Sequence, residues 1–121
     1  MFAHAPSRPS TSSSGLLSPT LPGSNTRAIL AFALFAAVQF ADAALTASGV
    51  SRFGTAMEAN PLVAAYINLC GLVPGLCAAK ALALSAGTIL HLSARYFALV
   101  LLTVLFVFAA LLPWELTLAL P

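Results

Sequence analysis

Three long apolar stretches constrain this chain more than any other feature. Residues 28–50 contain one charged side chain, Asp42, and residues 62–92 and 97–120 are interrupted almost as rarely. A helix of about 20 apolar residues crosses the ~30 Å hydrocarbon core of a bilayer. Only 7% of the 121 residues are charged, whereas soluble domains contain about 25%. The sequence therefore predicts an all-α integral membrane protein.

The charge balance limits the classes of partner. Five Lys and Arg against three Asp and Glu give a net charge of +2, and no basic run occurs. Nucleic-acid binding requires clustered basic residues, so the predicted environment is a lipid bilayer and no nucleic acid is expected. The sequence contains no phosphate loop, no H-E-x-x-H and no Ser-His-Asp order. It therefore predicts no catalytic residue, no cofactor and no metal site, and enzymatic activity is unsupported.

The N-terminal segment differs in composition from the rest. Residues 1–26 contain four Pro and seven Ser, and such a segment cannot bury enough apolar surface to offset its ordering entropy. We therefore expect a disordered tail over residues 1–26 and a membrane domain over 27–121.

A secretory signal peptide is the alternative for this end of the chain. Arg8 and Arg27 precede an apolar run that ends in Ala41-Asp42-Ala43, as an n-region, an h-region and a cleavage site would. The long polar leader, and apolar character that continues past the cleavage site, favour an uncleaved first helix.

The middle stretch is too long for one span. Asn60-Pro61 supplies a capping residue and a proline at the first helical position, so a helix should begin there. A single helix over residues 62–92 would measure about 46 Å, and the segment from Gly71 to Gly75 contains Pro74, which interrupts a helix. We expect a short helix before the second span. The predicted helices cover about residues 28–50, 61–70, 74–93 and 97–119.

The distribution of arginines indicates an orientation. Arg8, Arg27 and Arg95 fall on one side of the predicted bundle, and only Arg52 falls on the other. Because positive residues concentrate on the cytoplasmic side, the N-terminus should be cytoplasmic and the C-terminus outside. The predicted location is a cell membrane that the chain crosses several times.

A polar cluster is predicted inside the membrane. A charge there costs at least a few kcal/mol, so Asp42 needs a partner. Gln39, Asp42 and Thr46 share one helix face, and we expect Thr46 to donate to the carboxylate. If the second span begins near Pro74, Lys80 lies about 9 Å deep, close to the ~12 Å depth of Asp42. The pair is either a structural ion pair or a proton or ligand site.

Polar and sulfur-containing residues near the second span have local explanations. We expect Asn60 to cap the helix that begins at Pro61, with Glu58 beside it at the outer surface or folded back towards Lys80. Cys70 and Cys77 match no zinc or thioredoxin spacing. They are expected to be free apolar residues, unless an oxidising space joins them in a disulfide.

A fixed order of polar and turn-forming residues runs along the chain: Asp42, Thr46, Gly54, Glu58, Asn60, Pro61 and Lys80. It resembles the pattern of a family of small prokaryotic integral membrane proteins catalogued as a domain of unknown function. That pattern is D-x-x-x-T, a glycine, E-x-N-P and a lysine in the following membrane helix, and the match covers about residues 30–120. The resemblance implies a multi-helix membrane domain whose polar residues act together, without a known reaction or substrate.

Three functions remain open at this point. The first is a non-enzymatic accessory, assembly or regulatory membrane protein with a structural Asp42–Lys80 pair. The second is a subunit of an oligomeric transporter or ion-conducting complex, in which residues 61–75 form a gate. The third is an intramembrane enzyme that uses Glu58, Asp42 and Lys80 as acid and base groups. The expected partners are a second copy of the chain or another membrane protein.

Overall fold

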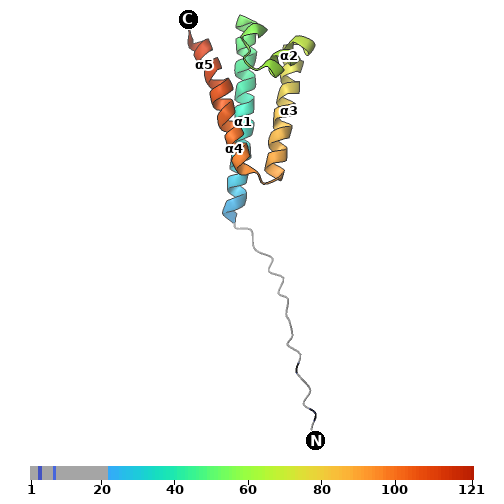
Figure 1. The fold of residues 1–121 in the computed structure, drawn as a ribbon. Coiled ribbons are helices and arrows are strands. Elements are labelled where there is room, and N and C mark those ends of the chain that lie inside the picture. The colour runs from blue at the N-terminus through green and yellow to red at the C-terminus, as the bar shows by residue number, and fades with distance from the viewer. Residues whose placement is uncertain (1–2, 4–6, 8–21) are drawn as a thin grey trace.

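The computed structural model describes residues 3, 7 and 22–121, and residues 22–121 form helices joined by short connections (Figure 1). Three helical stretches, Thr26–Phe53, Leu72–Leu92 and Tyr96–Ala119, are long and apolar enough to cross a membrane. The predicted all-α fold with three candidate spans and a short helix before the second is confirmed. The elements in order are α1 (Pro22–Phe53), η1 (Thr55–Met57), α2 (Pro61–Cys70), α3 (Leu72–Leu92), α4 (Tyr96–Phe106), η2 (Val107–Leu111) and α5 (Leu112–Ala119).

The first helix begins earlier than predicted. It starts at Pro22 instead of near Ala28, so residues 22–26 are helical and the predicted tail boundary at residue 26 is wrong. Proline suits a first helical position because its missing N–H group would have no partner there and its φ is already helical. The rest of the predicted tail, apart from the exposed Ala3 and Ser7, lies outside the described residues.

The start of α2 is confirmed at Pro61. The Asn60 side chain caps it, because Oδ1 accepts hydrogen bonds from the N–H groups of Leu62 and Val63 at 3.0 and 3.5 Å. Gly54 ends α1 with a φ of +86°, a conformation that favours glycine. The connector from Gly54 to Asn60 therefore has a defined conformation at both ends.

The break between α2 and α3 lies at Gly71, where φ is +91°. Helix α3 begins at Leu72, two residues before the predicted start, and Pro74 sits in its first turn. A proline there removes no intrahelical hydrogen bond, so the glycine and not the proline interrupts the helix. A Cβ on Gly75 would lie 2.7 Å from the backbone N and Cα of Ile67, which shows how closely the two helices approach.

The third span contains a feature that the sequence analysis did not predict. Between α4 and α5 the backbone widens into one π-helical turn, η2, over Val107–Leu111. Pro113 follows two residues after this turn. Its ring cannot donate to the carbonyl of Ala109, and it would clash with that carbonyl in a regular helix. The wider turn accommodates the proline and lets the span run on to Ala119.

Helix α1 is the centre of the bundle. Both α3 and the α4–α5 span pack against it, and the two join each other through the turn at residues 93–95 (Figure 1). Among the described elements, α3 contacts α4 but not α5. The two outer spans therefore diverge towards the end of the bundle that carries α2.

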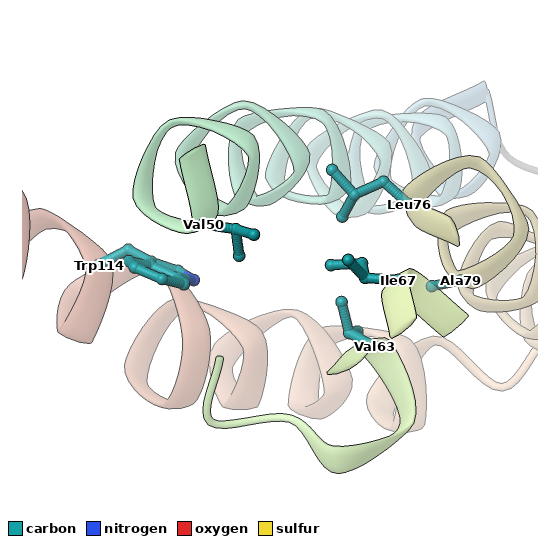
Figure 2. Packing of buried hydrophobic residues seen from close by; sticks show 6 residues of the cluster. All are labelled: Val50, Val63, Ile67, Leu76, Ala79 and Trp114. Atoms are coloured by element: carbon teal, nitrogen blue, oxygen red, sulfur yellow. The ribbon is translucent and has the colours of Figure 1, made fainter. Parts of the chain in front are cut away.

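A cluster of buried apolar side chains holds this diverging end together. Trp114 reaches from α5 towards Val50 of α1, while side chains of α2 and α3 point into the same space (Figure 2). Trp114 lies so close to Gly49 that a Cβ there would stand 1.9 Å from its ring. The cluster consists of Val50, Val63, Ile67, Leu76, Ala79 and Trp114.

Candidate functional site

The predicted partners Asp42 and Lys80 form an ion pair between α1 and α3. Lys80 Nζ contacts Asp42 Oδ2 and also donates a hydrogen bond to Gln39 Oε1 at 3.3 Å. Asp42 is 4% exposed and Lys80 is 9% exposed. The opposite charges meet because α3 begins only eight residues before Lys80, so its ammonium group lies level with the carboxylate.

The cluster leaves some hydrogen-bonding capacity unused. Gln39 Nε2 and Asp42 Oδ1 are buried and have no hydrogen-bond partner among the described residues. Thr46 is also buried, but the predicted hydrogen bond from its hydroxyl to the carboxylate is not formed within this part of the chain. Lys80 Nζ also lies 5.5 Å from the centre of the Phe106 ring, which is within range of a cation–π interaction.

An apolar layer closes the cluster on the side of the 93–95 turn. Phe35 and Leu99 are fully buried, and the Phe35 ring packs edge-on against Phe106 with 6.4 Å between ring centres. The absence of a side chain on Gly87 leaves room for the Phe35 ring, because a Cβ at this position would lie 2.1 Å from the ring. Lys80 and Asp42 are thus sealed from that end of the bundle.

Glu58 lies beside Asn60, as in the first of the two predicted positions. Its Oε1 accepts a hydrogen bond from the backbone N–H of Asn60 at 2.8 Å. The expected contact with Lys80 is absent, since Asp42–Lys80 is the single ion pair within the described range. Glu58 Oε2 is buried and has no partner among the same residues. Local capping therefore decides the position of Glu58.

Two neighbouring cavities lie between the connector that precedes α2 and the helices of the bundle. One of about 320 Å³ lies between residues 57–60 and the third span. The other, of about 230 Å³, has Asn60 and Lys80 in its wall. Asn60, Leu102 and Phe106 line both. Leu102 and Phe106 lie near the middle of the third span, so both cavities extend from the connector to that level, while Asn60 and Pro61 themselves are exposed.

The remaining sequence candidates do not join this site. Cys70 and Cys77 are free and exposed, so the alternative of a disulfide is not realised. His91 packs between Phe32 and Tyr96, with ring centres 5.0 and 6.1 Å away. Within the residues that the structure describes, no three His, Cys, Asp or Glu side chains gather where a metal ion could bind.

Sequence reasoning missed two residues of the site, Trp114 and Phe106. The hydropathy of residues 97–120 predicted only a membrane span, and nothing in the sequence showed that Trp114 would face Gly49. A small residue at Gly49 was the available signal, because small residues in membrane helices permit close approach of a neighbour.

Comparison with known proteins identifies no relative: no family model, no curated protein and no solved structure matches this chain.

Proposed function

We propose that this protein is a non-enzymatic accessory, assembly or regulatory protein of the bacterial inner membrane. One observation carries the proposal: the two buried charges neutralise each other across α1 and α3. Intramembrane charges that pair with one another commonly serve the architecture of the bundle. Such a protein acts through contacts made by its surface, where many large apolar side chains of α1, α3 and α4 are exposed.

The proposal includes the resemblance to the family of small prokaryotic integral membrane proteins of unknown function. The D-x-x-x-T, E-x-N-P and lysine pattern is interpreted as the residues that shape this bundle. In this interpretation the N-terminus is cytoplasmic and the 93–95 turn, with Arg95, faces the cytoplasm. The connector and the C-terminus then lie on the outer side.

Thiol-directed photocrosslinking in native membranes tests the proposal. Cys70 and Cys77 are exposed and free, so they accept a crosslinker without any further substitution. The expected product is one reproducible adduct with a different membrane protein, identified by mass spectrometry. The protein with both cysteines changed to Ser is the matched control. Absence of any adduct would contradict an accessory role.

A transporter or ion-conducting subunit is the second candidate. It is favoured by the cavity beside Lys80 and by the unpartnered buried atoms of Gln39 and Asp42. Three spans rarely enclose a pathway, so this function requires an oligomer. A crosslinking ladder made only of multiples of this chain would favour it over the accessory role.

An intramembrane enzyme is not proposed. Its three acid and base groups do not share a site, because Glu58 is held by Asn60 while Lys80 is held by Asp42.

A further inference from the structure

The cavity between residues 57–60 and the third span has the shape of a groove along that span. Its wall extends from Leu102 to Thr117, 15 residues apart, which corresponds to about 22 Å of helix. Most of the wall is apolar, with Leu105, Phe106 and Pro113 among its members. A volume of about 320 Å³ falls within the range of about 300–1,000 Å³ typical of small-molecule sites.

Two residues that line the groove, Trp114 and Asn60, carry hydrogen-bond donor groups. The indole N–H of Trp114 donates no hydrogen bond among the described residues. Asn60 uses its Oδ1 to cap α2, which leaves the NH₂ group of its side chain for a ligand. Donors in an apolar wall suit a carbonyl oxygen, such as that of an acyl ester.

Glu58 selects the charge of the occupant. It lines the same groove and its Oε2 is a buried acceptor without a donor in the described part of the chain. Glu58 forms no ion pair in the described part of the chain, where Lys80 pairs with Asp42 and Arg52 lies over the Phe53 ring. A carboxylate without a counter-ion disfavours an anionic ligand and favours one that carries an ammonium group.

We propose that the groove binds one acyl chain of an amine-bearing zwitterionic glycerophospholipid. The chain lies along Leu102–Pro113, the ester carbonyl accepts from Trp114 and Asn60, and the ammonium donates to Glu58. This inference goes beyond the accessory function and does not depend on the Asp42–Lys80 pair. It can therefore fail while the proposed function stands.

Trp114 makes the test direct, because it is the only tryptophan in the sequence. The full chain is reconstituted in vesicles in which either phosphatidylethanolamine or phosphatidylcholine carries bromine on its acyl chains, at equal bromine content. Bromine quenches indole fluorescence on contact. Trp114 is buried from the surface of the bundle, so strong quenching requires a chain inside the groove. The brominated ethanolamine lipid is expected to quench more strongly.

Two variants and a matched control identify the site. Ala109→Phe fills the groove and should abolish the excess quenching, whereas Ala81→Phe, on an exposed position of α3, should not change it. Glu58→Gln should reduce the preference for the ethanolamine lipid about tenfold, the effect expected when one charge-assisted hydrogen bond is lost.

Three outcomes would overturn the proposal. Equal quenching by both lipids in the unmodified protein refutes the role of Glu58. Quenching that survives Ala109→Phe shows that lipids around the bundle, not a lipid in the groove, reach Trp114. Absence of quenching by either lipid shows that a second copy or a protein partner closes the groove.

Discussion

Each of the two buried charges in this protein lies next to the opposite charge. Lys80 and Asp42 neutralise each other and Gln39 accepts one further hydrogen bond from Lys80, while the neighbouring Phe35 and Leu99 are apolar and fully buried. The effect of a substitution at either residue therefore depends on what happens to its partner.

A charge-removal cycle measures that dependence. Asp42→Asn and Lys80→Met are each expected to destabilise the bundle by roughly 3–5 kcal/mol, because each strands the other charge, whereas the double variant should recover much of the loss. The measurements are accumulation in membranes and thermal unfolding in mild detergent. Arg52→Met removes an exposed charge and is the control. If both single variants are as stable as the unmodified protein, the pair has no structural role.

A second residue-scale prediction concerns the contact between Gly87 and Phe35. Gly87→Ala should destabilise the protein by about 1–3 kcal/mol, because the new methyl group overlaps the Phe35 ring. Adding Phe35→Leu should restore part of the loss by vacating that space. Thermal unfolding of the single and double variants measures both effects. Ser85→Ala, at an exposed position of the same helix, should be near neutral. A Gly87→Ala protein of unchanged stability would mean that α1 and α3 do not pack this closely.

At the scale of single elements, the cap of α2 contributes measurable stability. Asn60→Ala removes the acceptor for the N–H groups of Leu62 and Val63 and should cost about 1 kcal/mol. Asn68→Ala changes the same residue type at an exposed helical position and should have little effect. Thermal unfolding distinguishes the two. Equal losses in both variants would contradict a capping role for Asn60.

The elements also show what the sequence determines locally. Long apolar runs and Asn60-Pro61 predict the helices because capping and hydropathy act within a few residues. The depth of Lys80 in the membrane could also be predicted, because helical rise per residue is regular and a residue count from the start of α3 places Lys80 level with Asp42. The hydrogen bond that places Glu58 beside Asn60 is local as well, whereas the contact of Trp114 with Gly49 joins segments that are distant in the sequence. The groove lies between residues 57–60 and the third span, which are distant in the sequence, so no local pattern encodes it.

At the scale of the whole molecule, the orientation in the membrane can be tested with the natural cysteines. With the N-terminus cytoplasmic, Cys70 and Cys77 lie near the outer end of the bundle, at or just after the α2–α3 break. A membrane-impermeant maleimide should therefore label Cys70 in intact spheroplasts of the Cys77→Ser protein. A cysteine placed at Ser93, in the cysteine-free background, should react only after permeabilisation. The reverse pattern would establish the opposite orientation.

The pairing of Asp42 with a residue 38 positions later also has a consequence during synthesis. The ribosome makes about 5–20 residues per second, so Lys80 follows Asp42 by about 2–8 s. Over that interval Asp42 lacks the lysine that neutralises it in the folded bundle. Insertion of the second span is then the event that commits the first to the bilayer, and a nascent chain arrested before Lys80 should be extracted from the membrane more easily than one arrested after α3.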